Sequence, residues 1–134
     1  MTIHRFKVDK LIRDKLPAMM RNDGLVVHEC ILEPDEFVSR LKDKLIEEAH
    51  EVYQAQDRAA LALELADVVE VVYALAHVSG LSMEHIEQKR QEKRTQRGGF
   101  DGHVYCAFVE VESTNPIIEY YRSRADQFPE IEPK

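Results

Sequence analysis

Two long segments of the chain, residues 35–56 and 58–79, are separated only by Asp57, and this arrangement constrains the fold most. In the first segment the apolar side chains recur at steps of three or four residues, which is the period of an α-helix: Phe37, Leu41, Leu45, Ala49 and Val52. Asp57 is a typical N-cap for a second helix, and Gly80 stands where that helix would end. The pattern predicts an antiparallel helical hairpin.

Carboxylates occupy positions on this hairpin where apolar side chains are expected. On a helical wheel Glu48 falls inside the apolar stripe of the first helix, seven residues after Leu41 and four before Val52. In the second helix, which is apolar on nearly every side, Glu64 and Asp67 share a stripe with residues 71, 75 and 78. A buried carboxylate needs protonation, a basic partner or a metal ion to offset its desolvation.

The acids of the two helices also lie at matching distances from the turn of the hairpin. Glu51 and Glu64 lie about 10 Å from the turn, and Glu48 and Asp67 lie about 14 Å from it, at 1.5 Å of rise per residue. The four side chains should therefore converge, and Mg²⁺ is the first candidate for such an oxygen-ligand site, with Mn²⁺ the second. The alternative is that these acids only solvate the helix surfaces. Glu47 points further toward solvent, and its role stays open.

Basic residues concentrate in a third expected helix, and a few more lie near the N-terminus. Arg and Lys hold phosphate oxygens well, so a phosphate ester gripped between the basic and acidic groups is one interpretation. The alternative is that the basic residues form weak surface pairs with Glu84, Glu87 and Glu92. The candidate phosphate ligands are Arg13, Lys44, Lys89, Lys93 and Arg97.

The remaining segments predict a mainly α fold with a small β accessory. A short helix over residues 10–22 should be broken or kinked by Pro17, Ser82 should cap the third helix, and Gly98 should stop it. Residues 25–32 and 103–111 have the character of strands, which predicts a β-hairpin or two-stranded sheet. A last helix should cover residues 116–125. We expect a core over residues 1–112, then a C-terminal helix and loose tail over 113–134.

Length and charge narrow the function. The 134 residues suffice for one domain with a small core, and the net charge of −7 argues against binding a nucleic-acid polymer or an anionic membrane. No run of eighteen apolar residues and no signal segment stands out, which favours a cytoplasmic protein. A helix that is apolar all round also predicts a homodimer or homotetramer.

Four motifs in order carry a family resemblance: "KLIRDKLP", "KLIEEAHE", "ELADVVEVVYAL" and "KRTQRGGF". Together they resemble the MazG-like all-α nucleotide pyrophosphohydrolase superfamily, in its phosphoribosyl-ATP pyrophosphohydrolase-like branch, over about residues 8–100. The resemblance implies a helical bundle, dimeric or higher, that hydrolyses the α-β phosphoanhydride of a nucleoside triphosphate to a monophosphate and pyrophosphate. A noncanonical, house-cleaning substrate is included in that expectation.

The resemblance also assigns roles to residues of this chain. Glu48, Glu51, Glu64 and Asp67 would hold Mg²⁺, and Glu47 and Glu48 would be the catalytic pair, with Glu47 orienting the attacking water or binding a further metal. The bound ion would offset charge on the phosphate oxygens and make water more acidic. Two alternatives stay open: phosphoribosyl-ATP hydrolysis in histidine synthesis, and a non-catalytic helical dimerisation or regulatory module. Neither the base of the nucleotide nor any role of residues 101–134 follows from the motifs.

Overall fold

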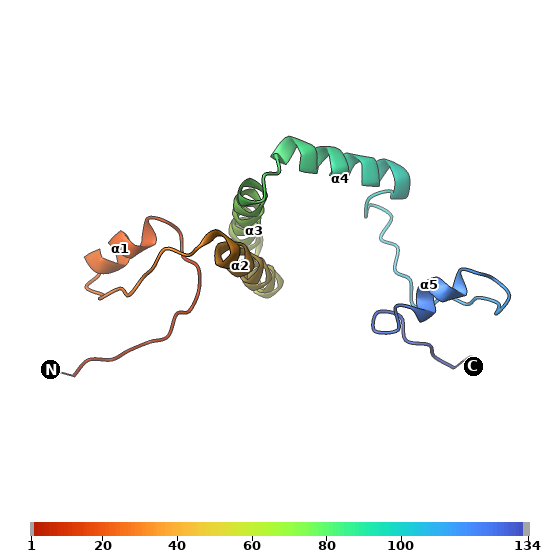
Figure 1. Ribbon diagram of the computed structural model, residues 1–134, viewed down its shortest axis with the longest axis horizontal. Coiled ribbons are helices and arrows are strands. Elements are labelled where there is room, and N and C mark those ends of the chain that lie inside the picture. The colour runs from red at the N-terminus through yellow and green to blue at the C-terminus, as the bar shows by residue number, and fades with distance from the viewer. Residues whose placement is uncertain (1, 133–134) are drawn as a thin grey trace. The chain divides into compact units, whose positions relative to one another are not determined.

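The computed structural model describes residues 2–132, and five helices account for the regular structure in that range (Figure 1). The expectation of a mainly α fold is confirmed. By contacts the chain divides into two compact units, Met1–Gln96 and Arg97–Lys134. The boundary predicted after residue 112 stays a prediction. The helices are α1 (Leu16–Asn22), α2 (Pro34–Gln54), α3 (Arg58–Val78), α4 (Met83–Arg97) and α5 (Ile118–Arg122).

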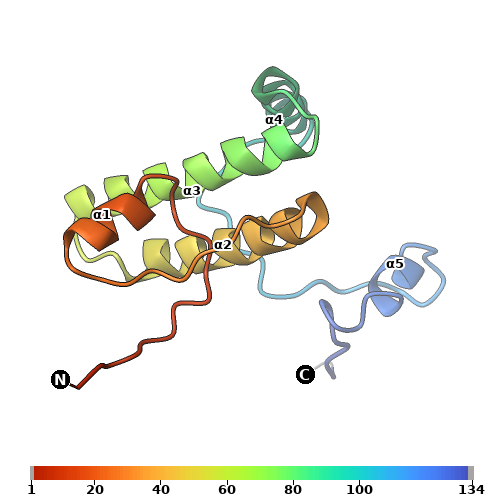
Figure 2. The same ribbon diagram turned by 60° about the vertical axis from the view of Figure 1, so that its left-hand side comes forward.

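The predicted hairpin is formed by α2 and α3, which lie side by side and run in opposite directions (Figure 2). Pro34 begins α2 in the first turn, where its missing N–H is not needed, and two acidic residues follow it there. Asp57 caps α3 as predicted, because its Oδ1 accepts a hydrogen bond of 2.8 Å from the backbone N–H of Ala60. Only a two-residue link and one cap residue connect α2 to α3. Because this connection is short, it determines which turns of the two helices face each other.

The apolar core of the hairpin is small. Among the described residues, the buried hydrophobic side chains are Leu41 on α2 and Val71 and Ala76 on α3. Another side of α3 carries an exposed apolar row at four-residue steps, made of Leu61, Leu65, Val69 and Tyr73. The described residues of this chain therefore leave part of the apolar surface of α3 exposed.

Helix α4 begins and ends as predicted. The Oγ of Ser82 accepts a hydrogen bond of 3.0 Å from the backbone N–H of His85, which caps the first turn. Gly98 follows the last helical residue with a φ of +85°, a conformation that glycine adopts without strain.

The bounds of the first and the last helix differ from the prediction. The first helix starts at Leu16 rather than residue 10, because Pro17 sits in its first turn, where proline is tolerated, instead of interrupting it. The last helix starts at Ile118 and not at Pro116, since residues 115–117 form a turn in which the side chain of Asn115 accepts a hydrogen bond from the N–H of Ile117. It ends at Arg122 rather than at residue 125. Residues 133–134 of the expected loose tail lie outside the described residues.

The predicted β-hairpin is wrong for the part of the chain that the structure describes, where neither residues 25–32 nor 103–111 form a strand. β-branched and aromatic residues at alternate positions supply a preference only, and a strand also needs a neighbour that pairs its N–H and C=O groups. Neither segment pairs in this way. Val104 and Tyr105 are accordingly about 90% exposed (91% and 90%). Within residues 2–132, no helix combines the length and apolar character needed to cross a membrane.

Candidate functional site

Three of the predicted metal ligands meet between the two helices of the hairpin. One carboxylate oxygen from each of Glu48, Glu64 and Asp67 lies within 4.8 Å of the others. Glu48 comes from α2, while Glu64 and Asp67 come from the same side of α3, one turn apart. We call these three residues the carboxylate cluster. The convergence follows from the hairpin, because Glu48 and Asp67 lie nine and ten residues from Asp57.

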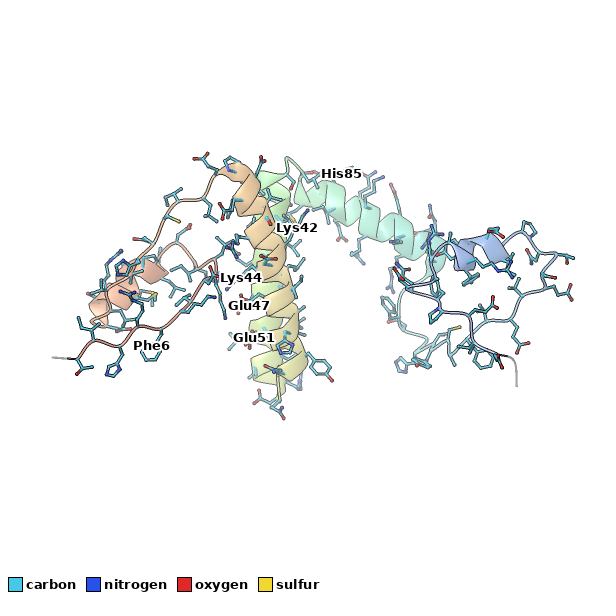
Figure 3. All side chains as sticks on the ribbon, turned by 60° about the horizontal axis from the view of Figure 1, so that its bottom comes forward. Phe6, Lys42, Lys44, Glu47, Glu51 and His85 are labelled. Carbon is cyan, nitrogen blue, oxygen red and sulfur yellow. The ribbon has the colours of Figure 1, made fainter. Side chains whose placement is uncertain are left out.

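Burial differs within and around the cluster. Glu48 is buried, with 8% of its surface exposed, whereas Glu64 and Asp67 are half-buried. Glu51, the fourth predicted ligand, is exposed, and Glu47 is half-buried although the helical wheel turns it toward solvent. Figure 3 shows both side chains on successive turns of α2. The role of Glu51 as a ligand stays a prediction.

The electrostatics of the cluster centre on Glu64. Burial, followed by the charges of Asp67, Glu51 and Glu48, raises the pKa of the Glu64 carboxyl above its ordinary value. Among the described residues, no basic side chain forms an ion pair with it, unlike Glu48 and Asp67. Glu64 is therefore the carboxylate of the cluster whose negative charge is disfavoured by burial and by neighbouring acids. No basic side chain among the described residues offsets that charge by an ion pair.

Basic residues from the N-terminal segment reach the other acids. Arg13 donates a hydrogen bond of 2.7 Å from Nη2 to Oδ1 of Asp67, a separation of 54 residues in sequence. Lys10 places its Nζ 3.3 Å from Oε1 of Glu47. The segment around residues 10–13 thus lies over the acids of the hairpin, and it explains why Glu47 is half-buried.

Lys44 links the acids of α2. Its Nζ lies 3.3 Å from Oε1 of Glu47, to which it donates a hydrogen bond, and 3.6 Å from Oε1 of Glu48. Both contacts follow from the helical spacing of three and four residues. The Lys10–Glu47 pair, in contrast, was missed by the sequence reasoning, because no periodicity in residues 9–13 indicates which helix face this segment covers.

Among the predicted phosphate ligands of α4, Lys89 makes a local contact. Lys89 pairs with Glu92 at 3.3 Å, as the surface-pair alternative expects. No hydrogen bond or ion pair joins Lys89 or Lys93 to the carboxylate cluster in the described part of the chain, and Arg97 belongs to the second compact unit. The structure thus brings Arg13 and Lys44 to the acids, and the phosphate roles of Lys89, Lys93 and Arg97 stay predictions.

The donor set of the cluster fits a hard divalent cation. All its ligand atoms are carboxylate oxygens, the chemistry that Mg²⁺ and Mn²⁺ prefer. A cation would also stabilise the charged form of Glu64, whose pKa is raised by burial and then by the neighbouring carboxylates. Both the geometry and the electrostatics therefore favour a hard divalent cation at these residues.

The segment that contains this hairpin matches the model of a known protein family. The family model of phosphoribosyl-ATP pyrophosphohydrolase matches residues 27–94, which include all of α2 and α3 and most of α4. No curated protein and no solved structure matched the chain in the corresponding searches.

Proposed function

The chain belongs to the phosphoribosyl-ATP pyrophosphohydrolase family, within the MazG-like superfamily of hydrolases that act on phosphoanhydrides, and from this premise we propose its reaction. The reaction is hydrolysis of the α-β phosphoanhydride of a nucleoside triphosphate, noncanonical ones included, to a monophosphate and pyrophosphate. The observation that carries the proposal is the convergence of Glu48, Glu64 and Asp67 on one point inside the matched segment. The substrates are cytoplasmic nucleotides, and we expect the enzyme to act there.

The carboxylate cluster, with Glu51, would hold Mg²⁺, or Mn²⁺ in its place. The ion supplies charge neutralisation on the phosphate oxygens and a more acidic water. Glu48 has both a catalytic and a metal-binding role in this proposal, because it is the buried acid that α2 contributes to the cluster.

Glu47 is the proposed group that orients water and accepts its proton. Its Oε1 already accepts a hydrogen bond from Lys44, and both side chains are half-buried, so the carboxylate is held in a defined position. The water oxygen bonds to the α-phosphorus as the bond to the bridging oxygen breaks, and the electron pair leaves with pyrophosphate. Arg13 and Lys44 would hold phosphate oxygens during this step, with Lys89, Lys93 and Arg97 as further candidates.

A panel of nucleotides incubated with Mg²⁺ tests the proposal, provided that pyrophosphate and orthophosphate are resolved among the products. We expect pyrophosphate and a nucleoside monophosphate from at least one triphosphate, and no turnover by Glu48→Gln. Orthophosphate release, or failure to hydrolyse any nucleotide in the panel, would rule out the proposed chemistry. A non-catalytic dimerisation module predicts the second of these outcomes.

The family match favours a second candidate substrate, phosphoribosyl-ATP itself. It carries the same α-β phosphoanhydride, so the same acids would serve. Including phosphoribosyl-ATP in the panel distinguishes directly between the two candidate substrates. Growth rescue of a histidine auxotroph that lacks this hydrolase step gives an independent answer, since a house-cleaning enzyme would not restore growth.

We also propose that the enzyme is a homodimer or homotetramer assembled through α3. The row of Leu61, Leu65, Val69 and Tyr73 is 38–52% exposed among the described residues of the chain. A second copy would remove this apolar surface from water. Sedimentation analysis distinguishes the oligomer from a monomer.

A further inference from the structure

A small pocket opens between residues 9–11 and one side of α2. Its volume is about 120 Å³, and six charged side chains line it: Asp9, Lys10, Arg40, Asp43, Lys44 and Glu47. Three of them are basic and three acidic, so their formal charges cancel. An anion that enters here meets a locally neutral surface on a chain whose net charge is −7.

Arg40 has hydrogen-bond donors to spare in this pocket. Its guanidinium nitrogens lie 3.7 Å from Asp9 and 3.9 Å from Asp43, both longer than the 2.7–3.2 Å of an N–H···O hydrogen bond. The side chain donates no hydrogen bond to any other described residue. Its planar fork can therefore take phosphate oxygens in pairs without first breaking a bond. Arg13 differs, since it is already bonded to Asp67 at 2.7 Å.

Lys44 joins this pocket to the carboxylate cluster. It lines the pocket and also lies 3.6 Å from Glu48, the buried acid of the cluster. Figure 3 shows Lys44 and Glu47 on the side of α2 that faces the N-terminal segment. A phosphate chain with one end at the cluster would thus reach Lys44 first and then Lys10 and Arg40.

We propose that this pocket binds the terminal phosphates of the substrate and the pyrophosphate they become, with Arg40 and Lys10 as phosphate ligands. The inference rests on the proposed function, because it names the place of the leaving group in that reaction. Neither residue is among the candidate phosphate ligands predicted from the sequence, although Lys10 is the first residue of the "KLIRDKLP" motif. The pocket assigns the leaving group to cations of the N-terminal segment and α2, in addition to any contribution from α4.

Equilibrium binding of pyrophosphate in the presence of Mg²⁺, measured by calorimetry on the full chain, tests the pocket without any turnover. Arg40→Gln should weaken binding about tenfold or more, since charge-assisted hydrogen bonds are lost. Asp43→Asn should tighten it, because one carboxylate that competes for Arg40 is gone. Lys42→Gln is the matched control: this exposed lysine of α2 lies 200° around the helix from Lys44 at 100° per residue, and it does not line the pocket.

The outcomes separate this inference from the proposed function. Suppose that wild type hydrolyses a nucleotide but Arg40→Gln binds pyrophosphate as tightly as Lys42→Gln does. This result would refute the pyrophosphate-binding role of the pocket and leave the proposed reaction supported. Arg40-dependent binding in a protein that hydrolyses nothing supports the anion pocket and refutes the reaction. Mn²⁺ affinity, measured without pyrophosphate, should be the same in Arg40→Gln and wild type, and a parallel loss of metal affinity would contradict a role confined to phosphate.

Discussion

Replacing Arg13 by glutamine should strengthen the binding of a divalent cation and weaken the binding of nucleotide. The guanidinium of Arg13 bonds to Asp67, a proposed metal ligand, at 2.7 Å. A cation that binds Asp67 must first displace this partner. Once released, Arg13 would be available to the phosphates that we propose it holds, and its charge would assist their binding.

The size of the effect follows from the exposure of the pair. The side chains of Arg13 and Asp67 are 57% and 39% exposed, so solvent screens their attraction. A well-formed but exposed ion pair contributes about 0.5–1 kcal/mol. Relief from that competition corresponds to a metal dissociation constant about two- to fivefold lower, at 1.4 kcal/mol per factor of ten. The removal of a positive charge next to the site acts in the same direction.

Titration of Mn²⁺ into nucleotide-free protein, followed by calorimetry or by the paramagnetic signal of the free ion, measures the first effect. Steady-state kinetics at saturating Mg²⁺ measure the second as a rise in KM. Lys15→Gln is a suitable control, because this lysine is exposed, lies in the same segment and forms no ion pair with the cluster. Unchanged or weaker metal binding in Arg13→Gln would refute the competition between guanidinium and metal.

Three further results are expected. Mg²⁺ at a hundredfold excess over its dissociation constant should stabilise wild type by about 2.7 kcal/mol and thus raise its Tm by several degrees in calorimetry. The Tm of Glu48→Gln should not change, and an equal rise in both proteins would exclude the cluster as the metal site. In chelator, the folded protein holds the proton of Glu64 more tightly than the unfolded chain does, since its pKa is raised from 4.5. The contribution of Glu64 to the free energy of unfolding should therefore be fully present below that value and be lost as pH rises through the raised pKa. Urea titrations should show a flatter pH dependence of stability for Glu64→Gln, and an identical one would argue against the shift. Val69→Glu should dissociate the oligomer in sedimentation runs, whereas a variant that sediments like wild type would place the interface elsewhere.

The sequence predicted the hairpin and the meeting point of its acids because both depend on local geometry. The helical period and the cap at Asp57 fix the angle and the height of each residue on α2 and α3. Those two quantities sufficed to bring Glu48, Glu64 and Asp67 together. The pairs of Lys44 with Glu47 and Glu48 follow from the same helical spacing.

The sequence could not decide which non-helical segments pair or what they cover. Residues 25–32 and 103–111 have the composition of strands, but pairing depends on a partner that alternation does not specify. For the same reason no pattern in residues 9–13 indicated that Lys10 and Arg13 lie on the acids of the hairpin, or that a pocket forms beside Arg40. Contacts within a helix repeat with a fixed period and can be predicted from spacing, whereas contacts made by an irregular segment have no period, so the tertiary structure alone determined them.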